Sequence, residues 1–308
     1  MKVVCLAGGV GGAKLADGLV RLLPPQDLTI VVNTGDDFRH LGLMVCPDLD
    51  TVMYTLAGVS NPLTGWGRAE ESWQVIGELL RLGGPDWFRL GDLDLATHLT
   101  RTHLLQEGQS LTAVTRHLCL HLAIQPEILP MSDQPAPTQI QTDSAILPFQ
   151  TWFVRERWQP VVRRVILPAD VRATPRVMQR LETADLVIIA PSNPFISVDP
   201  ILNVYPIREM LLDLPQAVVA VSPIIGGQAV KGPAAKMMGE LGLPATAAAV
   251  AGYYGDLIDG FVYDRQDVGT LNSVDIAGLC VDTLMADSDG RTRLARDVLT
   301  FALQLAEL

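Results

Sequence analysis

The sequence predicts an α/β protein whose core is a doubly wound, mainly parallel Rossmann-like sheet, with an inserted helical lobe and a small irregular lid. Three observations lead to this prediction. A short apolar run at residues 3–6 breaks into a glycine-rich turn and continues as a helical pattern at 15–23, and a second apolar run follows at 28–32. Strand, glycine turn, helix and strand in this order form a βαβ unit. Short apolar runs alternate with helical patterns again from residue 184 onward.

The first turn, GGVGGAK, is the best candidate for a phosphate-binding site. It places Gly9, Val10, Gly11 and Gly12 at the start of the first helix, followed by Lys14. Backbone N–H groups at a helix N-terminus point outward, and the helix dipole favours negative charge there. We therefore expect these five residues to hold a diphosphate. A tight turn without a ligand is the alternative.

Two established signatures match this turn incompletely. A dinucleotide fingerprint G-x-G-x-x-G that starts at Gly9 would need a glycine where Lys14 stands. A Walker-type loop has the lysine, but Ala13 replaces its second glycine and Leu15 replaces the hydroxyl residue that binds magnesium. The turn therefore points to a phosphate without identifying the class of nucleotide-binding protein.

Composition and charge exclude several classes of protein. The chain has 308 residues, is 48% hydrophobic and contains no run of about eighteen apolar residues, so we expect a folded protein that is neither exported nor membrane-spanning. Its four cysteines are scattered and form no C-x-x-C pair, which fits the reducing cytoplasm better than a disulfide framework or a zinc site. The formal net charge of -11 argues against non-specific binding to nucleic acid or to an anionic membrane.

The second strand ends at the sequence NTGDD, beside the expected phosphate site. Ligands of an open parallel sheet bind beyond the carboxyl ends of its strands, so Asp36 and Asp37 should lie next to the glycine turn. One of them could hold a ribose hydroxyl, as the acidic residue of a dinucleotide-binding fold does, or it could ligate a metal. The third alternative is that it only caps the turn.

The sequence CPDLDT at residues 46–51 is typical of a helix start, with a proline in the first turn. Asp48 is the expected cap of this helix. Asp50, two residues further on, should point elsewhere and could form, together with Asp36, the oxygen-rich site that Mg²⁺ prefers. We therefore predict a Mg²⁺ site between Asp36 and Asp50.

We treat the chain as a single domain, 1–308, made of a Rossmann-like core and an insertion. The core comprises residues 1–60 and 174–308. The insertion, 61–173, begins with three helical patterns that we expect to cover the mouth of the sheet, at 68–82, 93–105 and 111–122. It ends in a proline-rich, polar segment that we expect to form the lid, with strand-like pieces at 138–141 and 146–153.

Within the insertion, the sequence WFRLGDLDLATH combines an aromatic pair, a cation and an acidic helix start. Arg89 precedes the turn and could reach a substrate, whereas Asp92 and Asp94 are equally well explained as caps of the following helix. His117 and His121 lie four residues apart but lack the third ligand of a metal site. We expect them to form a surface or half-buried pair.

After residue 184 the alternation of strands and helices returns. A buried strand at 185–190 runs into PSNPFISVDP, whose small polar residues place hydroxyl and amide groups at the end of the strand. Ser192, Asn193 and Ser197 could therefore bind phosphate or ribose, or simply make the turn. Later strands are expected at 217–221, 247–251, 260–263 and 279–281, and a last helix at 294–305.

Seven motifs extend in one order over essentially the whole chain: GGVGGAK, NTGDD, CPDLDTVMYTL, WFRLGDLDLATH, LPMSD, APSNPFISVDPIL and SPIIGG. In this set the sequence resembles the 2-phospho-L-lactate transferases of coenzyme F-420 biosynthesis. The resemblance implies a transfer onto the deazaflavin 7,8-didemethyl-8-hydroxy-5-deazariboflavin from a guanosine diphosphate derivative of lactate or enolpyruvate. It also implies that GMP leaves with the assistance of Mg²⁺, and that the protein is a homodimer.

The resemblance assigns residues as well. Asp50 and Arg89 match the deazaflavin-binding positions of the family, although many relatives carry lysine in place of Arg89, which changes the hydrogen-bonding geometry. Asp36 matches a position that serves the metal together with Asp50. We accordingly predict Asp36, Asp37 and Asp50 as catalytic residues, of which Asp37 or Asp50 could also take the proton of the attacking hydroxyl.

Two other classes of protein stay open. A nicotinamide-dependent oxidoreductase would use Asp36 for the ribose, but the third glycine of its fingerprint is absent. A non-catalytic regulator of the same superfamily would bind a nucleotide or nucleotide sugar without consuming it. That branch lacks the PDLDT and LGDxDLATH motifs, whose presence here favours the transferase.

Overall fold

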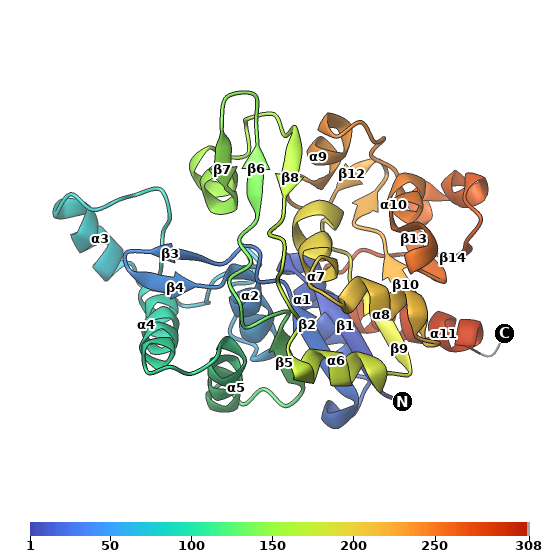
Figure 1. Cartoon of the computed structure of the whole chain (residues 1–308), viewed down its shortest axis with the longest axis horizontal. Coiled ribbons are helices and arrows are strands. Elements are labelled where there is room, and N and C mark those ends of the chain that lie inside the picture. Colours follow the sequence, from blue (N-terminus) through green and yellow to red (C-terminus); the bar gives the residue numbers. More distant parts are fainter. Residues whose placement is uncertain (307–308) are drawn as a thin grey trace.

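The computed structural model describes residues 1–306 and confirms the predicted α/β class. Its central sheet consists of β1 Val3–Ala7, β2 Leu28–Val32, β5 Glu127–Pro130, β9 Leu186–Ile189, β10 Ala217–Val221, β13 Gly260–Asp264 and β14 Ala277–Val281. The strands lie in the order β14-β13-β10-β9-β1-β2-β5, and all neighbours are parallel. Figure 1 shows this sheet at the centre of the molecule, with helices on both sides.

The chain builds this sheet outward from β1 in two directions. It first adds β2 and β5 on one side, and then returns to add β9, β10, β13 and β14 on the other. Cys5 in the middle of β1 is paired with Ile30 on one side and with Ile188 on the other. An open sheet that reverses direction in this way leaves a crevice at the carboxyl ends of the two strands where the reversal occurs. The loops after β1 and β9 therefore border one crevice.

Two separate cores lie on the two faces of the sheet because successive side chains of a strand point in opposite directions. Val4 and Leu6 of β1 belong to one core, and Val3, Cys5 and Ala7 belong to the other. The second core is covered by α1 Gly9–Val20, α2 Pro47–Leu56, α5 Leu111–His121 and α11 Ser288–Ala306. The first core is covered by α6 Pro175–Glu182, α7 Asp199–Leu202, α8 Ile207–Asp213, α9 Ala234–Glu240 and α10 Ala247–Tyr254.

Smaller elements project from this core (Figure 1). The helical lobe contains α3 Gln74–Arg81 and α4 Asp92–Gln106 beside the hairpin β3 Phe38–His40 and β4 Leu43–Val45. The lid is a three-stranded antiparallel sheet of β6 Gln139–Gln141, β7 Ile146–Pro148 and β8 Arg164–Ile166. A further hairpin is formed by β11 Ile224–Ile225 and β12 Gln228–Ala229. Among residues 1–306, no helix is both long and apolar enough to cross a membrane.

The structure corrects several expected elements. The strand expected at 247–251 is wrong, because this alanine-rich segment forms α10, whose first turn is capped by the Thr246 hydroxyl at 3.1 Å from the Ala249 nitrogen. Strand β5 lies inside the expected insertion but pairs with β2, so the central sheet interrupts that insertion. Helix α1 begins at Gly9, within the glycine turn and not after it, and α3 begins only at Gln74.

We expect Gly11→Ala to lower the free energy of unfolding by about 2 kcal/mol or more, because a Cβ atom would lie 2.1 Å from the carbonyl oxygen of Pro191. Gly239→Ala in α9 is the matched control, since a Cβ atom there meets nothing within 4 Å. It should change the free energy by less than about 1 kcal/mol, in the stabilising direction. Urea unfolding of both variants measures the difference, and equal stabilities would contradict the prediction.

Candidate functional site

The glycine turn connects β1 to α1 and packs tightly against two neighbouring loops. Gly9 has a φ of +62°, a conformation that side-chain-bearing residues rarely adopt. A Cβ atom at Gly8 would lie 2.7 Å from Cβ of Ser197 and 2.9 Å from Oδ2 of Asp48. These glycines therefore allow the N-terminus of α1 to lie directly against the loop after β9 and the start of α2.

The rest of the turn is packed in the same way. A Cβ atom at Gly12 would lie 3.1 Å from both Cα and Cβ of Ala7. Gly11 packs against Pro191 in the loop after β9. The side chain of Val10 lies against Gly65, which belongs to the segment that leads into the lobe. Close packing thus explains part of the glycine pattern. The sequence alone does not show whether a glycine is needed for packing or for binding a ligand.

Ser192 and Ser197 lie beside this turn, and Asn193 follows Ser192 in the same loop. The Ser192 hydroxyl donates to the carbonyl oxygen of Gly8 at 2.7 Å, which ties the end of β9 to the end of β1. Asn193 accepts a hydrogen bond from the backbone nitrogen of Phe195 at 3.0 Å, and Ser197 is buried against Gly8. The structure therefore brings the three predicted residues to the crevice, where Ser192 and Asn193 bond within the protein.

Three cations gather near the N-terminal half of α1. Lys14 is half-buried and donates to the carbonyl oxygen of Met285 at 2.8 Å; burial and the charge of Arg291 lower its pKa. Burial also lowers the pKa of Lys231, with a further contribution from the charge of Lys14. Lys231 donates to the carbonyl oxygen of Thr64 and so connects the core to the segment that enters the lobe. Of these three cations, the sequence predicts only Lys14.

An acidic cluster lies where β2 ends and α2 begins. The amide nitrogen of the fully buried Asn33 donates to Asp36 at 3.1 Å and to Asp48 at 2.9 Å. Burial raises the pKa of Asp48 to about 6, and burial together with the charge of Asp48 raises the pKa of Asp36 well above its ordinary value. Two buried carboxyl groups that share one amide donor are costly to ionise together. A divalent cation beside them would relieve that cost, so this pair fits Mg²⁺.

Asp37 lies close to this pair and to Asp50. Its buried carboxylate oxygens accept no hydrogen bond from a nitrogen or hydroxyl of the described residues, and the Cys46 thiol is the side-chain donor that faces them. Burial raises the pKa of Asp37 well above its usual value, although the Cys46 thiol and the charge of Arg101 act in the opposite direction. Asp48 is not the helix cap that the sequence predicts. It occupies the first turn of α2 behind the cap position Cys46, and faces Asn33 and the backbone of Gly9.

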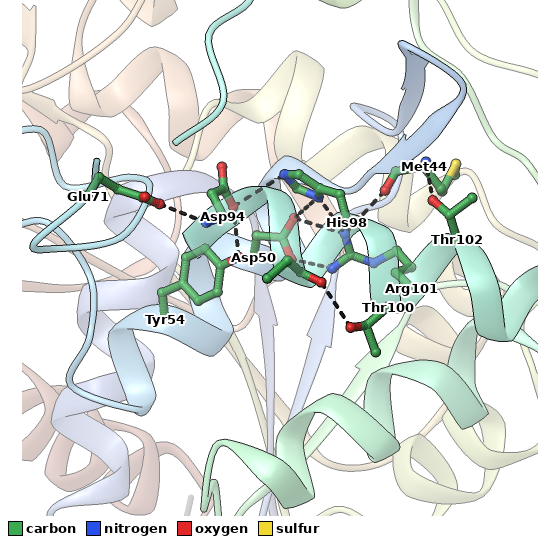
Figure 2. Close-up of polar contacts among 10 residues, drawn as sticks. Met44, Asp50, Tyr54, Glu71, Asp94, His98, Thr100, Arg101 and Thr102 are labelled. Atoms are coloured by element: carbon green, nitrogen blue, oxygen red, sulfur yellow. Dashed lines mark hydrogen bonds and ion pairs between the residues drawn. The ribbon is translucent and has the colours of Figure 1, made fainter. Parts of the chain in front are cut away.

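Asp50 belongs to a second cluster, which joins the core to the lobe. Figure 2 shows its carboxylate beside the guanidinium of Arg101, which comes from α4. One Arg101 nitrogen donates to Oδ2 of Asp50 at 3.1 Å, and the other donates to Oδ1. Both side chains are almost completely buried. Removing one partner of a buried ion pair costs about 3–5 kcal/mol because the other charge is left without compensation.

His98, Asp94 and Tyr54 extend this cluster away from Arg101 (Figure 2). Nδ1 of His98 lies 3.1 Å from an Arg101 nitrogen, which can only donate, so Nδ1 is the acceptor and Nε2 carries the proton. Nε2 lies 3.2 Å from Asp94, and the Tyr54 hydroxyl donates to Asp94 at 2.7 Å. Burial raises the pKa of Asp94, but the contacts with His98 and Tyr54 outweigh it and lower the pKa below its usual value.

Asp36 and Asp50 therefore have different partners. Asp36 faces Asn33 and Asp48, whereas both oxygens of Asp50 face Arg101. Ligand atoms of Asp50, Asp94 and His98 lie within 4.8 Å of one another, which is a possible cation site in geometry, but the Arg101 charge already compensates Asp50. The prediction that Asp36 and Asp50 share one Mg²⁺ stays a prediction, and Asp48 is the acid that lies beside Asp36.

The turn that contains Arg89 is held by an exchange of helix caps. Asp92 accepts hydrogen bonds from two backbone nitrogens at the start of α3, each at 3.1 Å, and Glu71 accepts from two at the start of α4, at 2.7 and 2.8 Å. Asp92 is thus a cap, but of α3 and not of its own helix, whereas Asp94 points to Tyr54 and caps neither. The exchange fixes α3 against α4.

A small hollow opens beside this turn. It has a volume of about 40 Å³, and its lining includes Trp66, Arg68, Glu71, Trp73, Arg89 and Asp94. The Arg89 guanidinium lies 4.8 Å from the centre of the Trp73 ring, a cation–π contact. His117 and His121, the expected surface pair, lie apart from this hollow on α5 with their rings 4.3 Å apart.

Several residues of these clusters escaped the sequence-based prediction. Asn33 is part of NTGDD, yet an asparagine that directly follows a strand is typical of a turn. Arg101 and His98 lie three residues apart on a helix, and this spacing indicates that they share one face. It does not indicate which part of the protein that face contacts. Tyr54 lies four residues after Asp50 on α2, within the motif CPDLDTVMYTL. This spacing puts the two side chains on one helix face, and it is the signal that could have assigned Tyr54 to the cluster of Asp50.

We expect Asn33→Ala to lower the free energy of unfolding by about 3 kcal/mol, because it leaves Asp36 and Asp48 without their shared donor in a buried site. Asn203→Ala is the matched control: its exposed side chain donates only to Pro168, at 2.7 Å, so the loss should stay below about 1 kcal/mol. Chemical denaturation at neutral pH compares them. Equal losses for the two variants would show that the cluster does not depend on Asn33.

Comparison with known proteins places this site in a family. A family model described as "2-phospho-L-lactate transferase CofD" matches residues 3–277. A protein of Streptomyces griseus named phosphoenolpyruvate transferase is 43% identical over 100% of this chain and 99% of its own length. A protein of Methanospirillum hungatei named 2-phospho-L-lactate transferase is 38% identical over 97% of this chain and 99% of its own.

Solved structures support the fold independently. The crystal structure of the Bacillus halodurans protein BH3568 superposes with a TM-score of 0.66 at 15% identity, and covers 97% of this chain and 99% of its own. At this identity the likeness concerns the fold alone. The sequence relatives and the family match extend over nearly the whole chain, and include the glycine turn and both acidic clusters. The chain belongs to the CofD family of transferases.

Proposed function

We propose that this protein transfers an enolpyruvyl phosphate group from a guanosine diphosphate donor to the deazaflavin 7,8-didemethyl-8-hydroxy-5-deazariboflavin, and releases GMP. The observation that carries the proposal is that the glycine turn and both acidic clusters meet at the first turns of α1 and α2. The relative named phosphoenolpyruvate transferase is 43% identical and that named 2-phospho-L-lactate transferase 38%, which favours enolpyruvate over lactate as the group carried.

The donor's diphosphate would lie at the N-terminus of α1. Backbone N–H groups of residues 9–12 and the positive end of the helix dipole favour an anion there. Lys14 and Lys231 add positive charge near the same helix, where Arg291 is paired with Asp17. Ser192, Asn193 and Ser197 border the crevice next to the turn and are the proposed nucleotide contacts.

The acceptor's ring would enter at the hollow beside Arg89. Asp94 and Glu71 of its lining connect to Tyr54 and to the start of α4, next to the cluster of Asp50. A volume of about 40 Å³ is below the roughly 300 Å³ of small-molecule sites, so the segment that carries Trp66 and Trp73 must move outward when the ring binds. Both tryptophans are partly exposed, so such a movement would not have to open the buried core.

Mg²⁺ is the proposed metal. Asp36 would hold it together with Asp48, whose buried carboxyl groups lack a compensating cation among the described residues; a place for Asp50 in this set stays a prediction. The ion would neutralise charge that develops on the diphosphate during transfer.

The chemistry requires positioning more than a covalent nucleophile. A ribityl hydroxyl of the acceptor attacks the phosphorus next to the enolpyruvyl group, the bond from that phosphorus to the GMP oxygen breaks, and the hydroxyl loses its proton. Asp37 is the proposed proton acceptor, because burial raises its pKa and it forms no ion pair with a described residue, whereas Asp50 is paired with Arg101. Asp50 would orient the hydroxyl.

The direct test is a transfer assay with the deazaflavin and each guanosine donor, followed by mass spectrometry of the product and quantification of GMP. We expect product and GMP in equal amounts with the enolpyruvyl donor and Mg²⁺, and loss of both when EDTA removes the metal. Turnover of the lactyl donor alone would identify the second candidate. Absence of GMP release with either donor, in a protein that binds GDP, would instead support the non-catalytic regulator.

Arg89→Ala should weaken binding of the deazaflavin about tenfold, because the side chain lines the hollow and offers a cation to the acceptor. Arg81→Ala is the matched control. Arg81 is the last residue of α3, its side chain is 76% exposed, and it pairs with Glu78 on the same helix. Quenching of deazaflavin fluorescence measures both dissociation constants. An unchanged value for Arg89→Ala would remove this residue from the acceptor site.

A further inference from the structure

The ion pair of Arg101 and Asp50 is unusual because the two charges come from different parts of the molecule. Asp50 lies in the first turn of α2, in the core, whereas Arg101 lies in the middle of α4, in the lobe. Only 1% of the Arg101 side chain and 7% of the Asp50 side chain are exposed. Taking two charges out of water is costly, so stability alone does not explain why the sequence places them here.

The pair has a defined geometry. Arg101 uses two nitrogens, one toward each oxygen of Asp50, so the plane of the carboxylate follows the plane of the guanidinium. The guanidinium is itself fixed by His98 at 3.1 Å and contacts the carbonyl oxygen of Met44 at 3.4 Å. Rotation of the Asp50 side chain would break both of its hydrogen bonds to this fixed guanidinium.

The same contacts lead back to the hollow. Figure 2 shows the order Arg101, His98, Asp94 and Tyr54, with Glu71 on the far side of Asp94. Asp94 and Glu71 line the hollow in which the acceptor would bind. An acceptor that contacts Asp94 thus touches one end of a chain of contacts whose other end orients Asp50.

We propose that Arg101 is a positioning residue, which holds the Asp50 carboxylate in the orientation that binds the deazaflavin acceptor. The inference rests on the proposed function and extends it to a residue outside the acceptor-binding positions. Arg101 itself is too deeply buried to contact a substrate, so it acts through Asp50. Its effect should therefore fall on the acceptor and spare the guanosine donor.

The test compares Arg101→Lys with the wild type. Lysine keeps the positive charge but cannot make two parallel hydrogen bonds to a carboxylate. We expect kcat/KM for the deazaflavin to fall about tenfold or more, while the dissociation constant of GDP changes by less than about twofold. A change that affects acceptor and donor equally would mean general structural damage and would overturn the proposal.

Thr102→Val is the matched control. Its hydroxyl accepts a hydrogen bond from the backbone nitrogen of Met44 at 2.8 Å, so it fastens α4 to β4, but it does not touch Asp50. The variant should lower the melting temperature and leave kcat/KM for the acceptor within about twofold of the wild type. A selective loss of acceptor turnover in this variant as well would assign the effect to docking of the lobe and overturn the proposal.

A second pair of variants decides the question if Arg101→Lys does not fold. His98→Leu removes the acceptor that faces Arg101, whereas His98→Asn offers an oxygen near the position of Nδ1. We expect a selective loss of about fivefold in kcat/KM for the acceptor in the leucine variant, mostly recovered in the asparagine variant. Equal values in the two variants would overturn the proposal. Failure of the wild type to use the deazaflavin would remove the proposed function and this inference with it.

Discussion

The buried ion pair between Asp50 and Arg101 is the interaction on which the arrangement of core and lobe depends. It connects the first turn of α2 to the middle of α4, and both side chains are almost completely buried. A buried charge without a partner costs several kcal/mol, so the pair forms only when the lobe takes one position against the sheet. The nearby bond from Met44 to Thr102 fastens the same two parts of the chain.

Close packing at the start of α1 supplies the other half of the site. Glycines let this helix approach the loop after β9, so its N-terminus points into the crevice where the sheet reverses direction. The acidic pair of Asp36 and Asp48 lies next to it, with Asn33 as its shared donor. A region that favours anions thus directly adjoins one that favours cations, which suits a diphosphate bound with a metal ion.

Most of the fold could be predicted from the sequence, because buried parallel strands leave short apolar runs and the glycine turn marks the first crossover. Residues 247–251 show the limit of such a prediction, because an alanine-rich apolar run suits a buried helix as well as a buried strand. In the folded chain this run forms α10. The site was predictable in its position but less so in its pairings. Asp48 has the sequence context of a cap, yet its carboxylate meets Asn33.

The sequence by itself determined which segments form the crevice, since the strand ends and the glycine placement follow from local patterns of apolar and small residues. It also determined the family, through motifs that extend over the whole chain. Only the tertiary structure decided that Asp50 faces Arg101 and that Asp36 faces Asp48. The physical reason is that a carboxylate takes its partner from whatever folding brings within about 3 Å, and that partner lies 51 residues away in the chain for Asp50.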